Sequence, residues 1–88
     1  MYKIVIHNKV AKRLKTVSKS HLRTLSALLE ALKTNPVSWR DFDLKKIVGA
    51  ENTYRGRIGD YRVVYFSEKE METIHILKFE LRGTVYKR

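Results

Sequence analysis

In the second half of the chain stands the stretch Tyr54-Arg55-Gly56-Arg57-Ile58-Gly59-Asp60-Tyr61-Arg62-Val63-Val64-Tyr65, which decides the fold. Gly59-Asp60 signals a two-residue hairpin turn, because glycine readily adopts the positive φ that a type II′ turn needs at its first position. Strand-forming residues alternate on both sides of this pair. The pattern predicts a β-hairpin over residues 53–67.

The register of this hairpin sorts its side chains onto two faces. With Gly59 and Asp60 in the loop, Ile58 faces Tyr61, Arg57 faces Arg62 and Arg55 faces Val64, and cross-strand partners share a face. One face is then apolar and aromatic, whereas the other is cationic. The apolar face carries Tyr54, Ile58, Tyr61, Val63 and Tyr65, and the cationic face carries Arg55, Arg57 and Arg62.

The three arginines on one face indicate an anion-binding surface. Like charges directly opposite each other destabilise a sheet. We therefore interpret the clustering of three guanidinium groups as a feature that serves to bind an anion. A phosphodiester is the anion we favour, while a solvated sheet face is the alternative for any one arginine taken alone. Lys45 and Lys46 are further candidates for contacts with an RNA backbone, although a solvated strand end explains them equally well.

The net charge also favours an anionic partner. Nineteen Lys and Arg residues stand against nine Asp and Glu residues, giving +10 and a pI of about 10.1. Such a balance points to nucleic acid or an acidic protein segment. A membrane surface ranks third, because no expected helix combines a basic face with a bulky aromatic one. The absence of cysteine excludes disulfides and thiolate sites, and no metal or organic cofactor is indicated.

The length of 88 residues is that of one small domain, 1–88. No apolar run is long enough to cross a bilayer, and the amino-terminal residues lack the apolar region of a signal peptide. We therefore expect a cytoplasmic protein.

The first half of the chain predicts a strand followed by two helices. Residues 2–7 are β-rich and alternate, Asn8 is a candidate cap for a short helix, and Ser18 or Ser20 is a candidate cap for a longer one. Apolar residues recur at helical spacing in both helices, and the residue before Pro36 ends the second. These apolar residues are Val10, Ala11, Leu14 and Val17 in the first helix and Leu22, Leu25, Leu28, Leu29 and Leu32 in the second.

After a polar connector over residues 35–43, strands are expected at 44–48, within the hairpin and at 73–80. The last has apolar residues on both faces, as in a central strand, and we interpret its His75 as a packed core histidine rather than an acid or base. The order β-α-α-β-β-β predicts an α+β fold. Its sheet is mostly antiparallel and twisted, with the helical hairpin packed on one face and the arginine face open.

The hairpin motif resembles the RelE/ParE toxin superfamily, most closely its archaeal RelE members. The likeness extends over essentially the whole chain, including the strand-helix-helix opening. Beyond the hairpin it rests on a terminal Arg-x-x-x-Tyr, from Arg82 to Tyr86, which favours RelE over ParE.

The resemblance implies a toxin of a type II toxin–antitoxin system that cleaves mRNA in the ribosomal A site without a metal. In this chemistry the 2′-hydroxyl attacks the adjacent phosphate and leaves a cyclic phosphate and a 5′-hydroxyl. The implied partners are a RelB-type antitoxin, mRNA on the ribosome and ribosomal RNA. Operator DNA bound through the toxin–antitoxin complex is a further candidate partner, whereas a membrane is not expected.

The resemblance also implies roles for individual residues. Arg57, Arg62 and Arg82 are the candidates for stabilising charge on the phosphate oxygens, with Arg55 holding flanking phosphates. Many bacterial relatives carry lysines at the positions of Arg55 and Arg57, and an arginine cannot act as a conventional base. Tyr86 is the remaining candidate base, provided that nearby cations lower its pKa. The alternative is that Tyr86 only stacks on a nucleobase and orients it.

Two other functions remain open. A ParE-like toxin would inhibit DNA gyrase through protein contact without cutting RNA. A relative with the same fold but without catalytic turnover would only bind RNA. This alternative stays open because arginines stand at both positions where many bacterial relatives carry lysines.

Overall fold

The computed structural model describes residues 1–35 and 44–81. The predicted strand-helix-helix opening is followed by four strands, one more than the order β-α-α-β-β-β contains. These four are the strand expected at 44–48, the two strands of the hairpin and the strand expected at 73–80. The elements are β1 (Lys3–Ile6), α1 (Asn8–Leu14), α2 (Lys19–Thr34), β2 (Lys45–Lys46), β3 (Thr53–Ile58), β4 (Tyr61–Glu68) and β5 (Thr73–Leu81).

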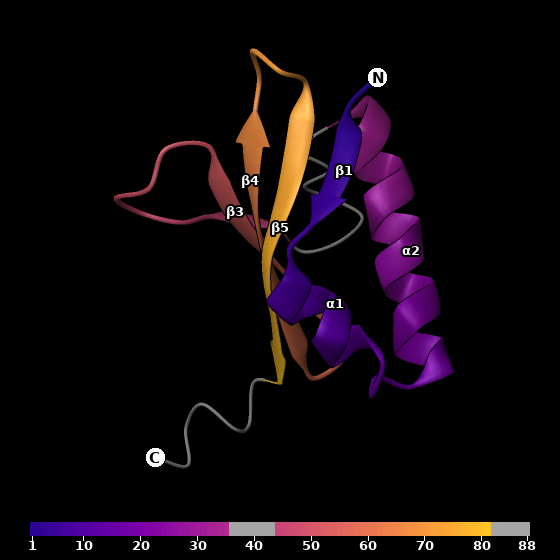
Figure 1. Ribbon diagram of the computed structural model, residues 1–88. Coiled ribbons are helices and arrows are strands. Elements are labelled where there is room, and N and C mark those ends of the chain that lie inside the picture. Colours follow the sequence, from indigo (N-terminus) through magenta and orange to yellow (C-terminus); the bar gives the residue numbers. More distant parts are fainter. Residues whose placement is uncertain (36–43, 82–88) are drawn as a thin grey trace.

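The strands form one five-stranded sheet in the order β1-β5-β4-β3-β2. β1 runs parallel to β5, whereas the other neighbours are antiparallel. The parallel pair needs a long connection, because a two-residue turn can join only antiparallel strands. Figure 1 shows α2 standing alongside the sheet and α1 beside the lower half of β5. The predicted α+β fold with a mostly antiparallel sheet is confirmed.

One face of the sheet packs against the helices and forms the core. Leu28 and Leu32 of α2 are completely buried, as are Val63 and Tyr65 of β4. The predicted helical spacing of leucines therefore marks the buried side of α2 correctly. The remaining core residues are Val10, Val17, Leu25, Leu44, Tyr54, Ile58, Ile74, Ile76 and Phe79.

The helix starts agree with prediction in one case and differ in the other. Ser18 caps α2, and its side chain accepts a hydrogen bond from the backbone N–H of His21 at 3.4 Å. The cap of α1 is His7 rather than the expected Asn8. His7 has extended backbone angles and its carbonyl accepts from the N–H of Ala11, which makes it the last residue before the helix.

The hairpin of β3 and β4 has the predicted register. Ile58 pairs with Tyr61, Arg57 with Arg62 and Arg55 with Val64. Gly59 has a φ of +59°, as a type II′ turn requires.

Strand β2 is shorter than the expected strand over residues 44–48. Only Lys45 and Lys46 pair with β3. After them the backbone N–H of Ile47 donates to the carbonyl of Thr53, and the chain turns through Gly49 and Asn52, both with positive φ. This turn ends the pairing before Val48 can join the strand.

β5 contains a bulge that the sequence pattern did not predict. Val64 pairs with Lys78, but the next residue, Tyr65, pairs with Ile76, so Leu77 has no partner in β4. An extra residue of this kind bends a strand and interrupts the alternation of its side chains. As a result, Ile76 and Phe79 both reach the core, although they are three positions apart.

Candidate nucleic-acid interface

The predicted arginines lie on the face of the sheet opposite the helices. Arg55 and Arg57 of β3 are exposed, and the side chain of Arg62 in β4 is 28% exposed. Arg57 and Arg62 are direct cross-strand partners, so their side chains leave the sheet on the same face. The open arginine face predicted from the hairpin register is therefore present.

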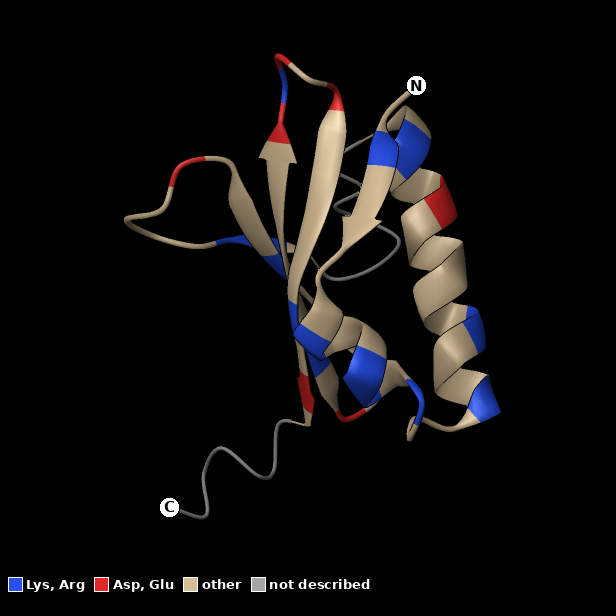
Figure 2. Cartoon of the chain, in the orientation of Figure 1, with Lys and Arg blue, Asp and Glu red and all other residues tan. Residues whose placement is uncertain are grey.

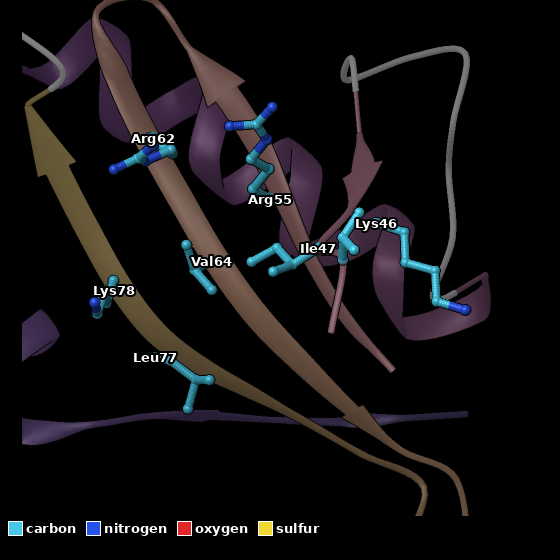
Figure 3. A pocket seen from close by; sticks show the side chains of 8 residues that line it. Lys46, Ile47, Arg55, Arg62, Val64, Leu77 and Lys78 are labelled. Atoms are coloured by element: carbon cyan, nitrogen blue, oxygen red, sulfur yellow. The ribbon is translucent and has the colours of Figure 1, made fainter. Parts of the chain in front are cut away.

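Arg55 and Arg62 border a pocket of about 430 Å³, which we call the cationic pocket. Figure 3 shows both side chains on the near face of the sheet, with the helices behind the strands. Val64 lies in the floor between the two arginines and Leu77. The lining residues are Lys46, Ile47, Val48, Arg55, Arg62, Val64, Leu77 and Lys78.

The two predicted lysines of β2 differ in their relation to this pocket. Lys45 pairs with Arg55 and belongs to the same side of the sheet. Lys46 borders the pocket, but Figure 3 shows its side chain extending away from Arg55. Both lysines are exposed at the sheet edge, so they are suited to contacts around the pocket rather than at its centre.

Two residues of β5 belong to the site although the sequence analysis did not select them. Lys78 adds a fourth cationic side chain to the border of the pocket, beside Arg55, Arg62 and Lys46. Glu80 pairs with Arg62 across the strands, and its carboxylate lies 3.7 Å from the guanidinium. The spacing of Ile74, Ile76 and Phe79 is the sequence signal that could have revealed the bulge. In a regular strand, Phe79 would point to the other face of the sheet from Ile74 and Ile76.

The Arg62–Glu80 ion pair orients the arginine without neutralising the pocket. Both side chains keep partial contact with solvent, at 28% and 37% exposure, so the pair contributes little to stability. Lys78, Arg55 and Lys46 retain a cationic excess around the pocket. Guanidinium groups are planar and carry several N–H donors, so this arrangement can hold an anion through more than one hydrogen bond.

Basic residues are also found on the first helix and next to it. Figure 2 shows Lys and Arg on α1 and on the first half of α2. Lys9 and Arg13 of α1 border a further pocket of about 380 Å³, together with Lys78 and Glu80. Since the two pockets share Lys78 and Leu77, positive charge continues from the sheet face to α1.

His75 is not the core residue that the sequence analysis expected. It lies on the open face, where its Nε2 is 2.9 Å from a carboxylate oxygen of Glu68. The bulge is downstream of His75, so the residue alternates normally with its buried neighbours Ile74 and Ile76. The apolar neighbours in sequence suggested burial, but in a strand they point to the other face.

Tyr65, the last residue of the hairpin motif, has a structural role. It is fully buried and stacks on Tyr54 with ring centroids 5.4 Å apart. Burial raises the pKa of the Tyr65 phenol above its ordinary value, and Tyr54 adds to the effect. This phenol therefore stays protonated at neutral pH and cannot serve as a general base.

Two predicted site residues, Arg82 and Tyr86, lie outside the described residues, as does most of the expected connector over 35–43. Within residues 1–35 and 44–81, no three His, Asp or Glu side chains are grouped as metal ligands would be. In the same ranges, no helix has the length and apolar character needed to span a membrane.

Comparison with known proteins places the chain in a family. A family model described as the ParE toxin of the type II toxin–antitoxin system parDE matches residues 4–86. A protein of Methanocaldococcus jannaschii, named as a candidate toxin RelE1, is 38% identical over 86 residues, which cover 98% of this chain and 96% of that protein.

Solved structures show the same fold. RelE in the archaeal RelE–RelB complex from Pyrococcus horikoshii OT3 superposes with a TM-score of 0.85 at 37% identity, covering 93% of this chain and 96% of that one. The RelB–RelE complex from Methanococcus jannaschii contains a chain with a TM-score of 0.78 at 24% identity, covering 94% and 95%. The match over residues 4–86 and the likeness to archaeal RelE together show that this chain belongs to the RelE/ParE family of toxins from type II toxin–antitoxin systems.

Proposed function

We propose that this toxin is a ribosome-dependent, metal-independent endoribonuclease that cleaves mRNA in the A site. The observation that carries the proposal is the convergence of Arg55, Arg57 and Arg62 on the open face, with two of them bordering one pocket. RNA phosphates are the ligands that such a cationic surface binds most readily.

The proposed reaction is an intramolecular phosphoryl transfer. The 2′-hydroxyl oxygen attacks the adjacent phosphorus, the bond from phosphorus to the 5′ oxygen breaks, and a proton reaches the leaving oxygen. Charge grows on the non-bridging oxygens, and guanidinium groups placed there stabilise it. We assign this role to Arg57, Arg62 and Arg82, with Tyr86 as the base that accepts the 2′-hydroxyl proton. Arg55, Lys45 and Lys46 would hold the flanking phosphates.

The proposal includes an antitoxin of the RelB type. RelE chains of similar fold have been solved in complex with RelB. With a net charge of +10, this toxin would attract an acidic partner over a long range. Such a partner could bind the cationic pocket and exclude RNA from it.

The test is in-vitro translation of a defined message with purified protein, followed by primer extension to map mRNA ends. We expect wild-type protein to produce A-site cuts, and Arg62→Ala or Arg82→Ala to reduce their rate by about 100-fold or more, as for loss of one transition-state donor. Arg23→Ala is the matched control, because Arg23 is an exposed arginine of α2, away from the open face. Full activity of Arg62→Ala, or its failure to fold, would refute the assignment of the site.

Inhibition of DNA gyrase is the second candidate function, because the matching family model is that of ParE. A supercoiling assay separates the two. Inhibited gyrase with an intact message would favour the ParE-like activity. If neither gyrase nor the message is affected while RNA still binds, the chain is a relative that binds RNA without turnover.

A further inference from the structure

The open face has a second pocket, of about 440 Å³, near the end of the sheet where β4 turns into β5. It is lined by His7, Thr53, Phe66, Glu68, His75 and Leu77, and we call it the aromatic pocket. Among the described residues, 1–35 and 44–81, no Lys or Arg lines this pocket, in contrast to the cationic pocket. A phosphate would therefore find no cationic partner in the lining of the aromatic pocket.

Three rings meet in the aromatic pocket. Phe66 and His75 are cross-strand partners whose ring centroids lie 5.9 Å apart, with an angle of 33° between the planes. His7 approaches His75 edge-on, also at 5.9 Å. Because Phe66 is only half-buried, its ring remains partly accessible on the open face. A partly exposed aromatic ring beside a second flat ring is a surface on which planar groups stack.

The carboxylate of Glu68 stands at the same pocket. One of its oxygens lies 2.9 Å from Nε2 of His75, which holds the side chain in place. An ionised carboxylate only accepts hydrogen bonds, and it has more than one acceptor position. It can therefore accept from an amino group of a ligand while it remains bound to His75.

The two pockets are adjacent. Leu77, the extra residue of the bulge, lines both of them. Along β4, Val64 belongs to the cationic pocket and Phe66 to the aromatic one. These two residues are separated by about 7 Å along the strand. A polyanion bound by Arg55 and Arg62 would thus pass directly beside the Phe66 ring.

We propose that the aromatic pocket binds a nucleobase of the RNA whose phosphates occupy the cationic pocket. The base stacks on Phe66 and its exocyclic amino group donates a hydrogen bond to Glu68. Bases that carry an amino group, such as cytosine, are then favoured over uracil, which has none. This inference rests on the proposed RNA substrate, and it adds a base-binding subsite to the phosphate-binding one.

The experiment measures binding of labelled oligocytidine and oligouridine of about eight nucleotides, a length within the range of single-strand sites, over a series of salt concentrations. Phe66→Leu keeps an apolar side chain but removes the ring. We expect it to weaken binding by at least about fivefold, the lower bound for loss of one base stack. The salt dependence should not change. Phe66→Trp should bind at least as tightly as the wild type.

Glu68→Gln should reduce the preference for cytidine over uridine. Val5→Ala is the control for both positions, because Val5 is exposed and pairs with His75 but does not line the aromatic pocket. It should leave binding unchanged.

Arg62→Ala distinguishes failure of the subsite from failure of the phosphate site. Losing one phosphate contact should lower the slope of log affinity against log salt by about 0.7 for a single strand. If Arg62→Ala has this effect while Phe66→Leu binds like the wild type, the base subsite is refuted and the phosphate site stands. If the wild type binds neither oligonucleotide, both are refuted. Should Phe66→Leu fail to fold, the same binding comparison is made with His7→Ala, because His7 lines the aromatic pocket but its side chain is exposed and makes no capping hydrogen bond. Unchanged binding by His7→Ala would then refute the base subsite.

Discussion

Individual residues of the hairpin serve either the turn, the core or the open face. Gly59 provides the positive φ of the turn and also makes room for α2. A Cβ at Gly59 would collide with the imidazole of His21, which lies against Tyr61 with ring centroids 5.2 Å apart. The sequence motif therefore contains a packing requirement as well as a turn signal.

Gly59→Ala should destabilise the protein more than Gly49→Ala does. Both glycines have positive φ, which disfavours alanine by about 1–2 kcal/mol. Only Gly59 is also blocked by a neighbour, because a Cβ at Gly49 would meet nothing within 4 Å. Urea unfolding of the two variants measures the difference. Equal free energies of unfolding would contradict the role of His21, and His21→Ala should restore part of the stability of Gly59→Ala.

Tyr65 should make the protein sensitive to alkaline pH. Burial raises the pKa of its phenol in the folded state, while the unfolded chain has the ordinary value of about 10. Above that pH the unfolded state loses the proton and the folded state retains it, so the free energy of unfolding falls as pH rises. Below it, this contribution is constant.

The check is urea unfolding of wild type and Tyr65→Phe at several pH values above and below 10. The variant should lose less stability with rising pH. Tyr2→Phe, at the margin of the core, is the control. An identical alkaline slope for wild type and Tyr65→Phe would be inconsistent with a neutral, buried phenol.

At the scale of elements, the bulge in β5 shapes the open face. Leu77, which the bulge leaves without a partner, lines each of the three pockets described above for residues 1–35 and 44–81, and Lys78 lines two of them. The bulge also keeps Ile76 and Phe79 together in the core. The bulge thus joins the packing of the core to the shape of the site.

Deleting Leu77 should preserve the fold and reduce activity. The deletion makes the pairs Tyr65–Ile76 and Val64–Lys78 consecutive, so the core residues keep their face. The strand should lose its bend, and a displacement of about 1 Å in a catalytic group can cost about 100-fold in rate. Circular dichroism and the primer-extension assay together test this. Unchanged cleavage by the folded variant would show that the bulge does not shape the site.

At the scale of the whole molecule, the sheet has a buried face and an open cationic face. Among the described residues, the basic groups of the open face and α1 outnumber the acidic groups near them, which are Glu68 and Glu80. The cationic residues of this surface are suited to phosphate contacts, which carry no sequence information, so any base preference would come from the aromatic pocket alone. The surface also offers few groups for acid–base catalysis, so we expect the ribosome to position the substrate.

Naked RNA should accordingly be a poor substrate. Purified protein incubated with a defined message should leave it intact, whereas the same message should be cut during translation. Efficient cleavage without ribosomes would contradict this expectation, because the protein would then position the RNA by itself.

Much of this protein could be predicted from the sequence because its strongest signals are local. The turn at Gly59-Asp60 fixes the register of the hairpin, and the register decides that Arg55, Arg57 and Arg62 share a face. The leucine spacing in α2 and the cap at Ser18 likewise depend on neighbours a few residues away. Family resemblance added the toxin class to these predictions.

Only the tertiary structure decided the bulge at Leu77 and the contact of Gly59 with His21. Each depends on residues distant in sequence: β5 must fit both its strand neighbours and the core, and α2 must pass over the hairpin turn. Local alternation contains no information about such fits. The sequence thus determined which side chains share a face of the hairpin. The packing of strands and helices against one another determined the pockets that those side chains surround.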